Sequence, residues 1–301
     1  MISQNLDYFA DGKGRTGYLA YDEAHPGRRP GVLVLHEGAG LGEHVRERAR
    51  RLAGLGYVAF ALDLFGGPFE SREQGIAAIT GMTADPSGLR RHADEALTLL
   101  KARAEVDPAR TAVIGFCFGG WAALEIARGG VELGCVVSFH GGLRAAKPAG
   151  PGEIKCPVLV CTGADDPHVP ADQRAAFEAE MTAAGADWRI NLYGGAQHGF
   201  TDASADPAKW PGSAYHAAPM RDRGGLCWTY SARCLGRSKE ARFHHKEHEG
   251  HEGWLLLRDH ASARAPSFPS SCALCSSWFD RRCAPRRRPR QSPLADSADP
   301  R

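Results

Sequence analysis

The sequence lacks the features that would direct the chain into a membrane or into a secretory pathway. No apolar run approaches the roughly 18 residues that a membrane-spanning helix needs. Residues 1–11 lack the charged start and apolar stretch of a signal peptide. The cysteines have no disulfide-framework spacing, and four lie in or beside predicted core strands: Cys117, Cys135, Cys156 and Cys161. We therefore expect a reduced, cytoplasmic setting.

A large net charge is also absent, because the 301 residues sum to only +2. This value hides two different regions. Residues 1–218 carry 21 Lys and Arg against 26 Asp and Glu, a net of −5, whereas residues 219–301 carry 16 against 9, a net of +7. We therefore expect a folded domain over residues 1–218 and a chemically distinct tail over residues 219–301.

Strand-like apolar runs alternate with segments of helical period through the first region, which is typical of a parallel sheet covered on both faces. The predicted strands span 31–35, 57–62, 111–114, 134–138, 157–162 and 188–193, and the predicted helices 43–55, 86–103, 120–128 and 171–184. The fold class is therefore α/β, with a doubly wound, mostly parallel sheet.

The pentapeptide 115–119, Gly-Phe-Cys-Phe-Gly, places Cys117 between one of these strands and a helix start. Flanking glycines make room for a sharp, strained turn that exposes the side chain above the sheet. The positive end of the following helix favours a thiolate there. A buried structural cysteine is the alternative interpretation, because free cysteine is commonly buried and inert.

Ligand chemistry in such sheets gathers at the carboxyl ends of the strands. Besides Cys117, reactive side chains follow three other predicted strands: His36 and Glu37, Asp165 and Asp166, and His198. Cysteine, aspartate and histidine thus occur in the order nucleophile, acid, base that α/β-hydrolases use.

Each group has a separable chemical task. Cys117 can form a thioester with an acyl carbon, His198 can accept and relay the proton, and Asp166 can orient the imidazole. Taken alone, the aspartate and the histidine could equally be solvated loop residues, and Asp165 could be the carboxylate that faces the ligand.

Together these segments resemble the dienelactone hydrolase (carboxymethylenebutenolidase) family. The matching segments are 36–38, 114–120, 138–142, 163–170 and 198–200, and the resemblance runs from about residue 5 to 218. It implies an α/β-hydrolase fold, an ester or lactone hydrolase without cofactor or metal, and Asp166 rather than Asp165 as the acid. It also gives Glu37 a role, since the family carries a glutamate there that interacts with the nucleophilic thiol and helps to generate the thiolate once substrate binds.

A carboxylate beside the thiol would also keep the resting enzyme unreactive by favouring the protonated thiol. The alternative is that Glu37 is an ordinary surface residue. The expected oxyanion-hole donors are the backbone amides of Gly38 and Phe118.

The substrate is less constrained than the chemistry. Relatives that take dienelactone bind its carboxylate with arginines, one of them four residues after the catalytic histidine. Here that position is Asp202, which would repel a carboxylate. Other arginines lie where a second anion-binding group could sit, but their spacing selects none: Arg72, Arg90 and Arg91. His140 either lines the substrate pocket or is structural.

We therefore expect a small-molecule ester or lactone as substrate. A thioesterase or peptidase-like acyl hydrolase on the same fold, or an inactive domain, are the alternatives. We expect neither a specific nucleic acid nor a membrane as partner, and the sequence leaves open whether the chain is a monomer or a homodimer.

The resemblance stops after residue 218, where relatives continue into a charged helix that packs on the sheet. The tail 219–301 is basic and rich in Cys, His and Arg, and we expect it to be disordered, as the product of a shifted reading frame or read-through. Segments 244–248 and 272–283 match parts of zinc motifs, and we attribute these matches to chance. We interpret the basic run 281–290 as a cluster of solvated charges rather than a nucleic-acid site. Loss of the last helix would uncover apolar sheet surface and lower stability or promote association.

Overall fold

One eight-stranded sheet organises residues 1–217, which are the residues that the computed structural model describes, apart from the side chain of Arg72. Every expectation for residues 218–301 lies outside the described residues. The strand order is β1-β2-β4-β3-β5-β6-β7-β8. The strands are β1 (Ile2–Ala10), β2 (Lys13–Tyr21), β3 (Arg29–Leu35), β4 (Val58–Ala61), β5 (Val106–Phe116), β6 (Cys135–Phe139), β7 (Val158–Gly163) and β8 (Trp188–Tyr193). The helices are α1 (Glu43–Gly54), α2 (Arg72–Ala84), α3 (Ser87–Lys101), α4 (Phe118–Arg128) and α5 (Ala171–Ala183).

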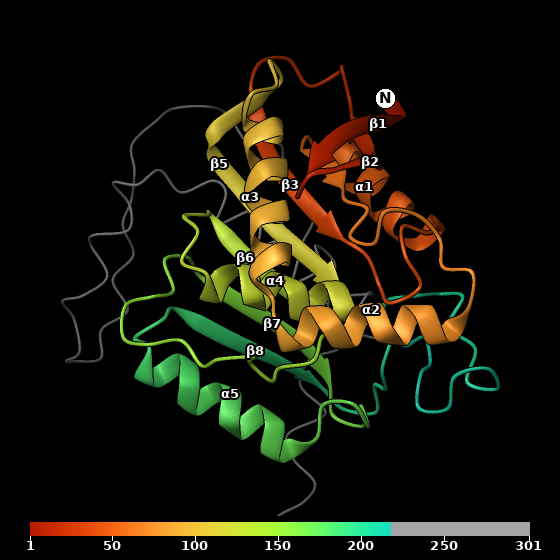
Figure 1. Cartoon of the computed structure of the whole chain (residues 1–301), viewed down its shortest axis with the longest axis vertical. Helices are drawn as coiled ribbons and strands as arrows, with labels where there is room; N and C mark the ends of the chain where they lie inside the picture. The colour runs from red at the N-terminus through yellow and green to blue at the C-terminus, as the bar shows by residue number, and fades with distance from the viewer. Residues whose placement is uncertain (218–301) are drawn as a thin grey trace, which may run out of the picture. The chain divides into compact units, whose positions relative to one another are not determined.

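The sheet is mostly parallel, which confirms the predicted fold class. Only the pairs β1–β2 and β2–β4 are antiparallel, and every other neighbouring pair is parallel. Figure 1 shows the β1–β2 hairpin at one end of the sheet and α5 beside β8 at the other. In the pairing register Leu35 lies opposite Gly115, and Phe116 opposite Phe139. The carboxyl ends of β3, β5 and β6 therefore coincide, and the loops that follow them meet.

Two elements were not predicted from the sequence. The β1–β2 hairpin turns at Asp11-Gly12, where both residues have positive φ, 47° and 72°. An Asp-Gly pair in this conformation is a strong hairpin signal, so the information was present in the sequence. Helix α2 is capped at its N-terminus by Ser71, whose hydroxyl accepts the Gln74 N–H at 3.3 Å. Glycines at 75 and 81 and a scattered apolar pattern conceal this helix from periodicity.

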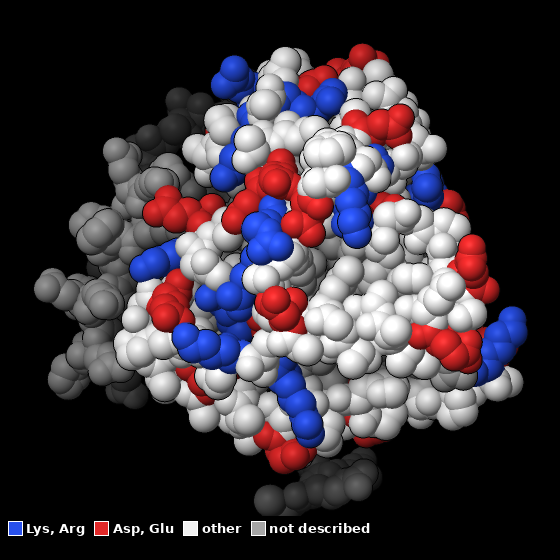
Figure 2. All heavy atoms as spheres, in the orientation of Figure 1, with Lys and Arg blue, Asp and Glu red and all other residues white. Residues whose placement is uncertain are grey.

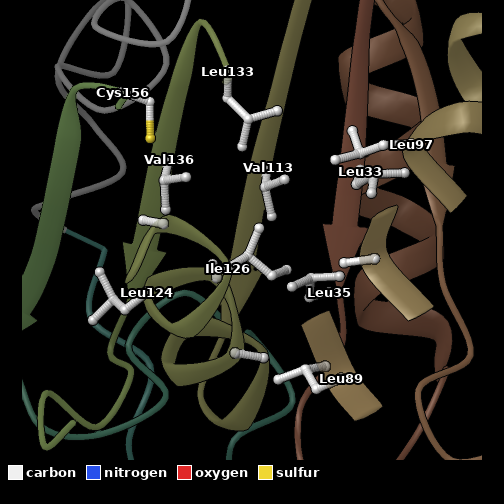
Figure 3. Close-up of a cluster of buried hydrophobic side chains, with 14 of the residues drawn as sticks. Leu33, Leu35, Leu89, Leu97, Val113, Leu124, Ile126, Leu133, Val136 and Cys156 are labelled. Carbon is white, nitrogen blue, oxygen red and sulfur yellow. The ribbon is translucent and has the colours of Figure 1, made fainter. Parts of the chain in front are cut away.

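Alternate residues of the central strands supply two apolar layers, one on each face. On β3, Leu33 and Leu35 face the layer shared with α3 and α4, whereas Val32 and Val34 face the layer shared with α1. Figure 3 shows part of the first layer, with Val113 and Val136 from the neighbouring strands and with Leu124 and Ile126 from α4. Burial on both faces explains why these strands read as continuous apolar runs.

Four small or branched side chains of β6 and β7 complete the layer on the α1 side: Cys135, Val137, Leu159 and Cys161. Each is at most 1% exposed. The predicted effect of losing the last helix concerns residues after 218 and stays a prediction from the sequence.

The outer surface carries charges of both signs. Figure 2 shows Lys and Arg interspersed with Asp and Glu on the visible face, and an area with few charges over α2. Within residues 1–217, none of the helices combines the length and the apolar character required to traverse a bilayer.

Candidate active site

Cys117 lies on the turn between β5 and α4 in a strained backbone conformation, with φ 52° and ψ −116°. The turn is tightly packed. A Cβ added to Gly115 would lie 1.9 Å from the carbonyl oxygen of Gly119, and one added to Gly119 would lie 2.3 Å from that of Leu35. The glycines are therefore required by backbone contact, and the contact holds the turn against the end of β3.

Three side chains from separate loops form a hydrogen-bonded row at this turn. The Sγ atom of Cys117 lies 3.1 Å from Nε2 of His198, and Nδ1 of His198 lies 2.9 Å from Oδ2 of Asp166. Asp166 follows β7 and His198 follows β8. The loops are joined by the Asp165 N–H, which donates to the Ala196 carbonyl at 3.0 Å. An imidazole between a thiol and a carboxylate can take the thiol proton and hold the resulting positive charge.

The His198 imidazole is strongly biased toward its charged form. Burial is the largest single influence and opposes protonation, but hydrogen bonds and charge from Asp166 and Cys117 outweigh it and raise the pKa of His198 to about 10. A raised pKa suits His198 to accept and hold a proton.

The structure places Asp166 rather than Asp165 against the imidazole. The Asp166 carboxylate is fully buried and its second oxygen accepts the His168 N–H at 2.8 Å, whereas Asp165 is exposed. A carboxylate held by a backbone N–H and by His198 keeps the ring in one orientation.

Glu37 follows β3 and is bound by a histidine from α1. Its Oε1 atom is hydrogen-bonded to Nδ1 of His44, and Nε2 of His44 receives the Arg48 Nε–H at 3.2 Å. Arginine can only donate, so Nε2 must be the acceptor and Nδ1–H donates to the carboxylate. Arg48 is 4% exposed and also donates to the Thr201 carbonyl. This row links Glu37 to the loop after His198.

His140 is buried beside the Cys117 turn. It is 1% exposed, and its Nδ1 accepts the Cys117 N–H at 3.1 Å. Nε2 must then carry the ring proton and donate to Oγ1 of Thr201 at 2.8 Å. Burial, followed by the charge of His198, holds the pKa of His140 well below its usual value. Both ring nitrogens are thus occupied, and of the two interpretations in the sequence analysis these contacts favour the structural one.

The two expected oxyanion-hole residues lie on adjoining loops. Phe118 is the first residue of α4, so its N–H has no acceptor within the helix. Gly38 follows β3, and residues 35–36 pack against Gly119 in the turn. Both amides therefore belong to the loops that border Cys117.

Two of the candidate anion-binding residues, Arg90 and Arg91, bind protein carboxylates. Arg90 donates to Glu125 at 2.8 Å, and Arg91 donates to Asp11 at 3.3 Å. Asp202 is partly exposed and accepts the N–H and the hydroxyl of Ser204. Both arginines of α3 therefore pair with carboxylates of the protein itself.

Sequence reasoning missed the contributions of His44, Arg48 and Thr201. The i, i+4 spacing of His44 and Arg48 on one predicted helix showed that they are neighbours. Their partners Glu37 and Thr201 come from distant loops, so no local pattern could reveal the network.

Comparisons with known proteins indicate the family of this chain. The model of the dienelactone hydrolase family matches residues 16–223. A Yersinia pestis protein named "Putative carboxymethylenebutenolidase" is 28% identical over 229 residues, which cover 71% of this chain and 81% of the relative. A Bradyrhizobium protein named "Probable 2-oxo-3-(5-oxofuran-2-ylidene)propanoate lactonase" is 29% identical over 207 residues, 65% of this chain and 82% of the relative.

Among solved structures, a dienelactone hydrolase-like promiscuous phosphotriesterase from metagenomic libraries is 39% identical. The alignment has a TM-score of 0.69 and covers 77% of this chain and 95% of that one. The similarity therefore extends over nearly the whole of the neighbour's fold.

Proposed function

The chain belongs to the dienelactone hydrolase family, and we propose that it hydrolyses esters or lactones through Cys117, His198 and Asp166 by way of an acyl-thioester. The observation that carries this proposal is the unbroken row from the Cys117 thiol through His198 to Asp166, at 3.1 Å and 2.9 Å. Nucleophile and base within hydrogen-bonding reach, with a third group orienting the base, are what acyl transfer requires.

The reaction runs in two halves. In the first, the thiol proton passes to His198 Nε2, Sγ forms a bond with the substrate carbonyl carbon, and the oxyanion is held by the Gly38 and Phe118 amides. The tetrahedral species collapses, the C–O bond to the alcohol breaks, and His198 returns the proton to the leaving oxygen. In the second half, neutral His198 takes a proton from water, and the resulting hydroxide forms a bond with the acyl carbon. The C–S bond then breaks, which releases the acid, and His198 returns its proton to Sγ to regenerate the thiol.

Glu37 acts on the thiol in this proposal. Family resemblance supports an interaction between this carboxylate and the Cys117 sulfur during the reaction. In the structure the carboxylate is bound by His44. Rotation of the Glu37 side chain away from His44 would bring its carboxylate to the Cys117 thiol, where it would favour the protonated thiol until His198 takes the proton. His44 and the thiol therefore compete for the Glu37 carboxylate.

We propose neutral or weakly charged esters and lactones as the substrate class. Asp202 occupies the position at which dienelactone-specific relatives carry a carboxylate-binding arginine. A negative side chain there disfavours substrates with a free carboxylate close to the scissile bond. A cytoplasmic setting stays a prediction from the sequence, which leaves the oligomeric state open.

Release of p-nitrophenol from short acyl esters tests the mechanism. We expect Cys117→Ala and His198→Ala to abolish release, because each removes a reacting group. Mass spectrometry of the wild-type chain quenched during turnover should detect an acyl adduct on Cys117. Activity that persists in Cys117→Ala would overturn the mechanism, and inactivity of the wild-type chain would favour the non-catalytic alternative.

A substrate panel separates the ester and lactone activity from the related possibilities. Lactones, oxygen esters, thioesters and peptide anilides are compared by kcat/KM on the same preparation. The similarity to a phosphotriesterase makes an aryl dialkyl phosphate a useful additional member, because a thiolate and two amide donors also suit attack at tetrahedral phosphorus. Preference for thioesters or anilides would replace the proposed substrate class while leaving the triad in place.

A further inference from the structure

His36, the residue directly after β3, has no part in the mechanism so far. It is fully buried, and both nitrogens of its ring are hydrogen-bonded to the backbone. The Leu64 N–H lies 3.0 Å from Nε2, and the carbonyl oxygen of Glu37 lies 2.6 Å from Nδ1. A buried polar ring with two backbone partners fixes the positions of both segments.

These partners determine the ring's protonation state. A backbone N–H can only donate, so Nε2 must be the unprotonated acceptor and the ring proton must be on Nδ1, which donates to the Glu37 carbonyl. Burial lowers the pKa of His36, which keeps the ring in this neutral form. The partner segment is itself anchored, because Asp63 Oδ1 accepts the N–H groups of Phe65 and Gly66 at 3.1 Å and 2.9 Å.

The hydrogen bond to the Glu37 carbonyl has a consequence for Gly38. The carbonyl of Glu37 and the N–H of Gly38 belong to one planar trans peptide, in which they point in opposite directions. Holding the carbonyl toward His36 therefore directs the Gly38 N–H away from His36. Within residues 1–217 no acceptor takes this N–H, so it is available to a ligand. The Gly40 N–H also donates to the Glu37 carbonyl, at 3.1 Å, and holds the same peptide from within the loop.

We infer that His36 is a positioning residue for the oxyanion hole: it orients the Glu37–Gly38 peptide so that the Gly38 amide faces the charge that develops on the substrate carbonyl oxygen. The inference rests on the proposed function, in which Gly38 stabilises the oxyanion. His36 thus affects how well the transition state is stabilised, and it does not affect the reactivity of the Cys117 thiol.

Three substitutions separate the two hydrogen bonds of the ring. In His36→Asn the side-chain amide N–H lies near the position of Nδ1 and can still donate to the Glu37 carbonyl. In His36→Gln the side-chain oxygen can reach the position of Nε2 and accept the Leu64 N–H, but the donor to Glu37 is lost. His36→Leu loses both. The matched control is His92→Leu, because His92 is also buried, at 2% exposed, and its hydrogen bond goes to Tyr8.

Two rates are measured on each variant: steady-state hydrolysis of p-nitrophenyl butyrate, and alkylation of Cys117 by iodoacetamide. In alkylation the thiolate forms an S–C bond at the methylene carbon and iodide leaves with the electron pair, so no carbonyl oxyanion develops. Hydrolysis needs the oxyanion hole and alkylation does not.

We expect kcat to fall about 10- to 100-fold in His36→Leu and His36→Gln, with KM and the alkylation rate within about twofold of wild type. His36→Asn should stay within about threefold of wild type in kcat. The control His92→Leu should lower the melting temperature without lowering kcat. If His36→Leu does not fold, the comparison of His36→Asn with His36→Gln carries the test.

Equal kcat in His36→Asn and His36→Gln would overturn the inference. So would a loss of alkylation that parallels the loss of kcat, because His36 would then support the thiol or the fold as a whole. Failure of the proposed function has a different signature, in which Cys117→Ala retains hydrolysis.

Discussion

Replacement of Gly115 by alanine is the sharpest test of how the nucleophile turn is built. The added Cβ would lie 1.9 Å from the Gly119 carbonyl oxygen, about 1.5 Å short of the 3.4 Å at which ordinary contact begins. Both partners are backbone at the junction of β5 and α4, so neither can rotate away. The start of α4 must therefore shift by an amount of that order, and Cys117 and the Phe118 amide shift with it.

The consequences of this shift can be given magnitudes. Forced overpacking of a core position typically destabilises by about 1–3 kcal/mol, and we expect Gly115→Ala to reach at least the upper end because backbone must move. Displacement of a reacting group by about 1 Å can lower the rate about 100-fold. Urea unfolding followed by tryptophan fluorescence gives the first quantity, and kcat/KM on a p-nitrophenyl ester gives the second.

Gly142→Ala is the matched control, since a Cβ there meets nothing within 4 Å and the residue does not have positive φ. We expect this variant to retain wild-type stability and activity. If Gly115→Ala also retained both, the close contact between Gly115 and Gly119 would not exist in solution, and the account of the strained turn would be refuted.

Three further predictions concern charge. Glu125 is fully buried and pairs with Arg128 at 3.1 Å, so Glu125→Ala should lower the free energy of unfolding in urea titrations by about 3 kcal/mol. The exposed Arg91, which pairs with Asp11, is the control, and Arg91→Ala should cost less than about 1 kcal/mol. Similar losses in the two variants would contradict the buried network. Burial lowers the pKa of His92 in the folded protein to about 4, whereas in the unfolded chain the pKa of this histidine is about 6.5. Between these two values the unfolded state binds more protons than the folded state. Protonation of His92 on unfolding should therefore lower the free energy of unfolding by about 2 kcal/mol when the pH falls from 7 to 5. The His92→Gln variant lacks this contribution, so its free energy of unfolding should fall by about 2 kcal/mol less than that of the wild type. Asp202→Arg should raise the ratio of kcat/KM for carboxylate-bearing lactones to kcat/KM for neutral esters by about tenfold, which corresponds to ~1.4 kcal/mol. If this ratio does not change, the substrate carboxylate does not lie near residue 202.

The elements that position the active site could be predicted because their signals are local. Each central strand is buried on both faces and reads as an apolar run, and α3 shows helical period over its whole length. The Gly-Phe-Cys-Phe-Gly segment specified the turn at Cys117, since only glycine fits where backbone meets backbone. The β1–β2 hairpin was not predicted, although its Asp-Gly pair is a local hairpin signal.

The neighbours of the reactive groups could not be predicted in the same way. His44 and Arg48 read as two polar residues on a helix, yet the fold turns them toward Glu37 and Thr201. His140 read equally well as a pocket residue or as a structural one, and only the approach of Thr201 and of the Cys117 amide favoured burial.

The sequence by itself determined the order of β3 to β8 and of the helices α1, α3, α4 and α5 among them. It also determined the turn that presents Cys117 and the sequence positions of Asp166 and His198 after later strands. These depend on periodicity and on residues adjacent in the chain. The tertiary structure decided which ring nitrogen carries the proton in His36, His44 and His140. It also decided which carboxylate contacts which base and where the Gly38 amide points. Those choices depend on hydrogen-bond partners from segments distant in the chain, which meet only when parallel strands end at the same edge of the sheet.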